Sequence, residues 1–118
     1  MEITKLDNKD IVIIKSDEIL IKDGQSILDL IMSIRYDLGC SNIIISKENI
    51  DESFFELKTG FAGEILQKIA NYRFRVAIVG DFTVYTSKNL KDFFYESNKG
   101  NIVFFLPDID EAIQRLDK

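Results

Sequence analysis

The segment 54–64, Phe-Phe-Glu-Leu-Lys-Thr-Gly-Phe-Ala-Gly-Glu, contains the residues of this chain best suited to bind or receive a phosphate group. Thr59 and Gly60 stand where a predicted helix begins, so we expect Thr59 to be the N-cap, with the first free backbone N–H groups beside it. Such a helix end attracts anions. Thr59 is therefore the candidate phosphoacceptor.

Four cations, Lys58, Lys68, Arg73 and Arg75, lie close to this segment in the sequence of a chain whose net charge is -5. They predict a basic island around Thr59. The candidate ligands for an anion are Lys58, Thr59, Gly60, Gly63 and Arg73. The other interpretation follows the usual role of such residues: Thr59 caps the helix, the two glycines permit close packing of helix on sheet, and the cations form a solvated face. The glycine spacing does not indicate a P-loop, because no Lys-Ser/Thr pair follows it.

Asp81 follows a predicted strand and is a further candidate ligand-binding residue, beside Thr83 and Tyr85. Ligands gather at the carboxyl ends of parallel strands. Asp is also a common turn residue, because its side chain bonds the turn backbone. Both interpretations of Asp81 remain open.

The chain has no His and a single Cys, which excludes several kinds of site. No catalytic unit that needs His, no imidazole ligand for a metal and no internal disulfide can form. No carboxylate pair stands out as a general acid and base, so we predict no catalytic residues, no metal and no cofactor. Cys40 is expected to be a small buried apolar residue.

Continuous apolar runs alternate along the chain with segments whose apolar residues recur at helical spacing. These two patterns predict the strands and helices that position the candidate residues. The expected strands are 11–14, 42–46, 76–80 and 102–106, with 4–6 pairing with the first of them. The expected helices are 27–38, after a break at 23–26, then 60–72, 87–98 and a last one after Asp108. This order predicts a single α/β domain over residues 1–118, with a mostly parallel sheet of four to five strands and about four helices.

Bulk properties set expectations for location and partners. The polar N-terminus and the lack of an apolar run of about 20 residues predict neither a secretory signal nor a membrane span. A free Cys fits a reducing compartment, so we expect a cytoplasmic protein. Net acidity disfavours nucleic acid as a partner.

The sequence resembles the bacterial domain of unknown function 4180 family over nearly its whole length. The resemblance rests on Phe54-Phe55-x-Leu57-x-Thr59-Gly60-x-Ala62-Gly63-Glu64, Gln67-Lys68, Asn71-Tyr72-Arg73 and Val79-Gly80-Asp81. To our knowledge the family has no assigned activity, so the resemblance itself implies no reaction.

The layout is also similar to that of STAS domains, the fold of anti-sigma-factor antagonists. That resemblance implies a regulatory domain whose phosphorylated hydroxyl, in an Asp-Ser-Ser-Gly-type motif, begins the second helix. Leu57-Lys58-Thr59-Gly60 occupies that place here, which puts Thr59 at the position of the acceptor. The acidic residue of the motif is missing, and Lys58 changes the charge that a kinase would meet.

Three hypotheses about function follow. The first is a non-enzymatic, STAS-like module that binds a protein partner and is switched by phosphorylation of Thr59. The second is a binder of, or enzyme on, a small anionic metabolite at the start of helix 60–72, with Asp81 or Glu64 as base. The third, compatible with either, is a homodimer that packs exposed Phe side chains from the pairs 54–55 and 93–94 across a two-fold axis.

Overall fold

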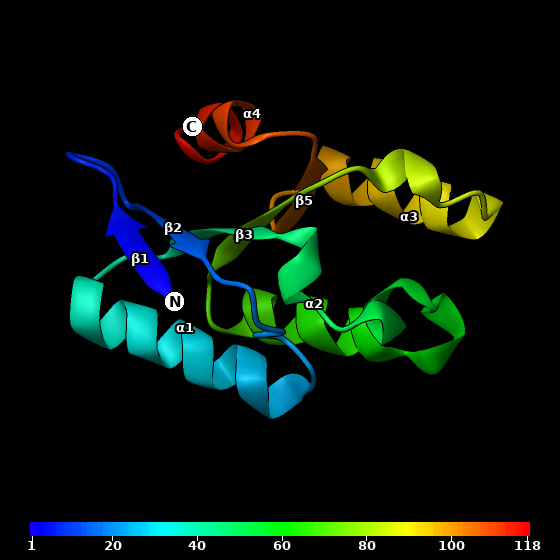
Figure 1. The fold of residues 1–118 in the computed structure, drawn as a ribbon, viewed down its shortest axis with the longest axis horizontal. Coiled ribbons are helices and arrows are strands. Elements are labelled where there is room, and N and C mark those ends of the chain that lie inside the picture. Colours follow the sequence, from blue (N-terminus) through cyan, green and yellow to red (C-terminus); the bar gives the residue numbers. More distant parts are fainter.

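The computed structural model, which describes residues 1–118, contains one five-stranded sheet and four α-helices (Figure 1). The strands are β1 (Glu2–Lys5), β2 (Ile11–Lys15), β3 (Asn42–Ser46), β4 (Arg75–Val79) and β5 (Val103–Leu106). The helices are α1 (Gly24–Leu38), α2 (Phe61–Asn71), α3 (Lys88–Lys99) and α4 (Ile109–Leu116). The predicted fold class is confirmed.

The strands lie side by side in the order of the sequence, β1-β2-β3-β4-β5. The first pair is antiparallel and the other three pairs are parallel. The predicted break at 23–26 is wrong in part: Asp23 accepts a hydrogen bond from the Ser26 N–H, so this segment caps α1 and the helix begins at Gly24. Gly39 ends α1 with a φ of 67°, in the left-handed conformation predicted for a helix stop.

Helices cover both faces of the sheet. The three connections between parallel strands all advance in the same direction across the sheet. Because such crossovers are right-handed, their helices lie on the same face. α1, α2 and α3 pack there on a core of 22 buried residues. α4 returns across the other face, where Ala112 and Leu116 complete a core of 7 residues (Figure 1). Because both faces are covered, the strands appear in sequence as continuous apolar runs.

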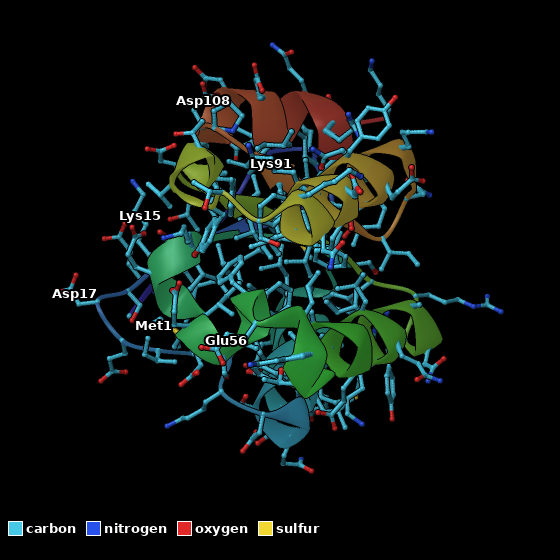
Figure 2. All side chains as sticks on the ribbon, turned by 90° about the vertical axis from the view of Figure 1, so that its right-hand side faces the viewer. Met1, Lys15, Asp17, Glu56, Lys91 and Asp108 are labelled. Atoms are coloured by element: carbon cyan, nitrogen blue, oxygen red, sulfur yellow. The ribbon has the colours of Figure 1, made fainter.

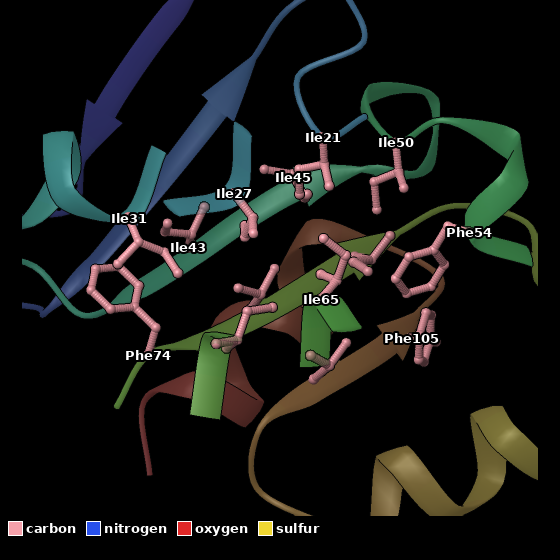
Figure 3. Close-up of a cluster of buried hydrophobic side chains, with 14 of the residues drawn as sticks. Ile21, Ile27, Ile31, Ile43, Ile45, Ile50, Phe54, Ile65, Phe74 and Phe105 are labelled. Carbon is pink, nitrogen blue, oxygen red and sulfur yellow. The ribbon is translucent and has the colours of Figure 1, made fainter. Parts of the chain in front are cut away.

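The larger core draws on the loop after β3 as well as on the helices (Figure 3). Ile43 and Ile45 of β3 point into it, whereas Ile44 points to the smaller core. Phe54 belongs to a 3₁₀ turn, Glu52–Phe55, and its side chain is 0% exposed. Its ring lies 6.2 Å from that of Phe105 on β5. The connection between β3 and α2 is therefore anchored in the core.

Asn49 fastens the segment after β2 to the segment after β3. It is 0% exposed and uses its whole amide. Nδ2 donates to the carbonyls of Ser16 (2.8 Å) and Glu18 (2.9 Å), and Oδ1 accepts from the Ser46 N–H (3.1 Å). The Asn49 carbonyl also accepts from the Ile21 N–H at 3.0 Å. One residue thus fixes two loops at the carboxyl end of the sheet.

β5 forms one edge of the sheet, and its outward backbone groups at Phe105 are already paired. The Gly80 N–H donates to the Leu106 carbonyl (3.1 Å), so Leu106 faces β4 and the alternation of the strand turns Phe105 outward. Asn98 of α3 meets it there: Nδ2 donates to the Phe105 carbonyl at 3.0 Å, and Oδ1 accepts from its N–H at 2.7 Å. A side chain thus takes the place of a further strand.

Candidate functional site

Thr59 lies exposed in the connection between β3 and α2, and we call residues 56–60 the Thr59 loop. Its hydroxyl lies within hydrogen-bonding distance of two carbonyl oxygens, those of Glu56 (2.8 Å) and Ser53 (3.3 Å). Its oxygen accepts from the Phe61 N–H at 3.1 Å. The hydroxyl thus fastens the loop to the first residue of α2.

The N-cap of α2 is Gly60, so the prediction of Thr59 as N-cap is wrong by one residue. Gly60 adopts φ 78°, a left-handed conformation that costs glycine little and other residues more. The N–H of Glu64 donates to the Gly60 carbonyl at 3.1 Å, while the N–H groups of Ala62 and Gly63 have no recorded partner. Free donors therefore stand at the start of α2, close to Thr59 in the chain.

The suggestion that Gly60 and Gly63 permit close packing of helix on sheet is also wrong. A Cβ built at either glycine meets no atom within 4 Å. Gly60 is required for its backbone conformation alone, and Gly63 faces open space. The close approach of helices occurs at Gly24 of α1, where a Cβ would lie 2.4 Å from Cε of Lys68.

The predicted basic island around Thr59 does not form. Lys58 precedes α2 and Arg73 follows it, and an 11-residue helix separates them by about 16 Å. Lys68 lies against Gly24 of α1. Arg75 starts β4 and donates to Asn42 and to the Leu116 carbonyl. Neighbours in sequence were placed at opposite ends of a helix, so Lys58 and Arg73 do not share one site.

Lys58 borders a shallow hollow of about 340 Å³ between the Thr59 loop and the start of α3. Ser87 and Asn89 line the opposite side of this hollow. Ser87 caps α3, and its hydroxyl accepts from the Leu90 N–H at 3.3 Å. The polar side chains that the start of α3 and its N-cap contribute to this hollow are therefore uncharged, and the charged ones, Glu56 and Lys58, come from the Thr59 loop.

Asp81 follows β4 and lies apart from the Thr59 loop. Its Oδ1 accepts from the Thr83 hydroxyl and from the Thr83 N–H (3.0 Å), as the turn interpretation predicts. These two bonds lower the pKa of the Asp81 carboxyl. Asp81 also lines a cavity of about 750 Å³, which has no lining residue in common with the hollow beside Lys58. The predicted ligands thus divide between separate places.

Tyr85 connects the segment after β4 to residues 47–55, which precede the Thr59 loop, a contact that the sequence did not predict. Its ring stacks on Phe55, with centroids 4.8 Å apart, and its hydroxyl donates to Oε1 of Glu52 at 3.0 Å. The Lys47 ammonium lies 5.1 Å from the centre of the Tyr85 ring. Burial, followed by the bond to Glu52, raises the pKa of the Tyr85 phenol.

We expect the Tyr85 phenol to ionise at a higher pH than a free tyrosine, whose pKa is about 10. The unfolded chain then loses this proton first as the pH rises, so the folded state loses stability above about pH 10. The measurement is an absorbance titration of the phenolate in the wild type and in Tyr85→Phe. A difference curve with its midpoint at or below pH 10 contradicts the prediction.

The Phe pairs belong to the core, so the predicted dimer surface of exposed Phe rings is wrong, while a homodimer formed through another surface stays a prediction. Phe54, Phe55 and Phe94 are buried, and Phe93 is half-buried. Eight aromatic rings, seven of Phe and that of Tyr85, contact one another in the core under α3. Cys40 is buried as predicted, and that burial raises the pKa of its thiol.

Two absences concern the whole described chain. No group of three or more His, Cys, Asp or Glu side chains is arranged to hold a metal ion. None of the helices combines the length and the apolar character that crossing a membrane requires.

The architecture is that of a STAS-like α/β domain. A solved structure from Thermotoga maritima, described as an anti-sigma factor antagonist, superposes with a TM-score of 0.51. The match covers 99% of this chain and 94% of that one, at 16% sequence identity. In sequence, residues 6–116 match the family described as Domain of unknown function (DUF4180), and the chain belongs to this family. Among curated proteins, no relative is found.

Proposed function

We propose that this chain is a non-enzymatic regulatory domain that binds a protein partner through the Thr59 loop and α2, and that phosphorylation of Thr59 releases the partner. The observation that carries the proposal is the exposed Thr59 hydroxyl at the entry to α2, directly after the β3 connection. Its place in a STAS-like fold supports it, since the solved structure with this fold is described as an anti-sigma factor antagonist.

The contacts of Thr59 explain how a phosphate would act. Phosphoryl transfer from a nucleoside triphosphate replaces the hydroxyl proton, so Thr59 can no longer donate toward the carbonyls of Glu56 and Ser53. The added charge of about -1.5 to -2 stands next to these carbonyl oxygens and near the free N–H groups of α2. The loop must therefore rearrange, with the phosphate turned toward the helix start.

The anchoring of the loop makes this change local. Phe54 and Phe55 hold the residues before Thr59 in the core, and Ile65 and Ile69 hold α2. Glu56, Lys58, Thr59 and Gly60 remain exposed between these anchors (Figure 2 shows Glu56 at this surface). A partner that contacts the exposed residues meets either a neutral hydroxyl or a dianion on an otherwise unchanged domain.

Affinity capture with Thr59→Asp tests the proposal. We expect wild type and Thr59→Ser to retain a common partner from lysate, and Thr59→Asp to lose it, because a carboxylate supplies negative charge and removes the donor. Thr86→Asp is the matched control, since Thr86 is exposed and makes no side-chain hydrogen bond. Mass spectrometry of the captured chain reports phosphate on the Thr59 peptide. Retention of the same proteins by all four chains contradicts the proposed switch.

A further inference from the structure

The cavity beside Asp81 lies where two neighbouring parallel strands end. Gly80 follows β4, Leu106 ends β5 and Pro107 follows it; all three line the cavity. Its volume of about 750 Å³ is in the range of small-molecule sites, and the carboxyl end of a parallel sheet is where such sites concentrate. Figure 2 looks toward this end of the molecule, with Lys91 and Asp108 labelled.

The apolar wall of this cavity is fixed in place by aromatic packing. Phe82 and Phe105 line it, with ring centroids 5.4 Å apart and nearly perpendicular. Phe94 supports both from below, at 5.1 Å from Phe82 and 4.6 Å from Phe105. The wall is therefore preformed, so binding there need not order it first.

Two opposite charges border the same cavity without neutralising each other. Asp81 receives both of its hydrogen bonds on Oδ1, and Oδ2 has no recorded partner in the chain. Lys91 on α3 is exposed, and its ammonium forms none of the ion pairs of the structure. Bonds from Thr83 lower the pKa of the Asp81 carboxyl, so it is ionised at neutral pH. The cavity thus presents a free carboxylate oxygen, a free ammonium and an apolar wall.

We infer that this cavity binds a small zwitterion, an amino acid with a large apolar side chain. The ligand ammonium meets Oδ2 of Asp81, its carboxylate meets the Lys91 ammonium, and its side chain packs on Phe82 and Phe105. A simple anion is opposed by Asp81, and a simple cation is opposed by Lys91. This site goes beyond the proposed partner switch and shares no lining residue with the hollow beside the Thr59 loop.

Three probes with one phenyl ring test the inference: phenylalanine, 3-phenylpropionate, which lacks the ammonium, and 2-phenylethylamine, which lacks the carboxylate. Each is titrated into the isotopically labelled full chain and followed by amide chemical shifts. We expect phenylalanine to bind about tenfold or more tightly than either analogue, because each analogue loses one charge-assisted hydrogen bond. The shifts should cluster at Gly80, Thr83 and Lys91.

Two substitutions assign the contacts. Asp81→Asn can still accept from Thr83, and it should abolish the preference for phenylalanine over 3-phenylpropionate. Lys91→Gln should abolish the preference over 2-phenylethylamine. Asp110→Asn and Lys22→Gln, exposed and outside the cavity, are the matched controls and should bind as the wild type does. The amide spectrum of each variant reports whether it is folded.

Three results overturn the inference. The first is equal binding of the three probes by the wild type, or binding of none. The second is an unchanged preference in folded Asp81→Asn and Lys91→Gln. The third is a set of shifts that lies outside the cavity.

Discussion

Replacing Phe54 by Ala is expected to lower the free energy of unfolding by about 3–5 kcal/mol, the range for truncating a buried aromatic side chain. Phe54 is 0% exposed, and its ring lies 5.0 Å from Phe55, 6.1 Å from Phe61 and 6.2 Å from Phe105. These rings come from a loop, a helix and a strand, so no single element can move to fill the space. The loss includes both burial and an unfilled cavity.

Urea unfolding measures this loss. Phe54→Leu should retain more stability than Phe54→Ala, because it fills part of the same space. Tyr95→Ala is the matched control, since Tyr95 is 63% exposed on α3. We expect it to change stability by less than about 0.5 kcal/mol. Equal losses in Phe54→Ala and Tyr95→Ala contradict the assignment of Phe54 as the anchor of the Thr59 loop.

Replacing Asn49 by Ala is the second large effect, about 2–4 kcal/mol, although no apolar core is lost. The substitution leaves the carbonyls of Ser16 and Glu18 and the N–H of Ser46 without their buried partner. A buried group left unpaired costs about 1–3 kcal/mol. Asn49→Asp should be still less stable at neutral pH, because a carboxylate oxygen then faces the two carbonyls that Nδ2 now bonds.

Urea unfolding checks the expected order of stability, in which the wild type is most stable, Asn49→Ala is less stable and Asn49→Asp is least stable. Asn71→Ala is the control. Asn71 is exposed at the end of α2, and its side chain makes no hydrogen bond. Asn49→Asp should regain part of its stability on acidification, as the introduced carboxylate takes up a proton. If Asn49→Asp is as stable as the wild type, the amide does not hold the two loops as described.

The sequence was sufficient for the fold because each element carries its own signal. The run Ile43-Ile44-Ile45 indicates a strand covered on both faces, and the two cores on either side of β3 confirm it. The glycine after α1 marked the helix end correctly. The first residue of a helix was harder to predict. α1 begins before its first apolar residue because Asp23 and Ser26 cap it through polar contacts, which the spacing of apolar residues does not reveal.

The candidate site was less predictable, because closeness along the chain was taken for closeness in space. Lys58 and Arg73 flank α2, so the helix that seemed to join them separates them. Thr59 was correctly placed near the helix start, yet the left-handed Gly60 shifts the cap by one residue. The sequence could not show that Lys91 borders the same cavity as Asp81, because Lys91 lies on the following helix, α3. Only the Ser-x-x-Asn pattern of 46–49 offered an early sign of Asn49, as a capping box.

The Asn98 amide on Phe105 also limits how copies of this chain can associate. With the outward groups at Phe105 already paired, the opposite edge strand, β1, is the one whose outward groups are more open to a neighbour. There the Leu6 N–H bonds the Ile11 carbonyl, which turns the backbone groups of Ile3 outward beside a half-exposed side chain. Two chains joined along β1 would form one continuous sheet whose outer strands are both β5. Asn98 would still occupy the backbone groups of Phe105 on both outer strands, which disfavours the addition of a further strand there.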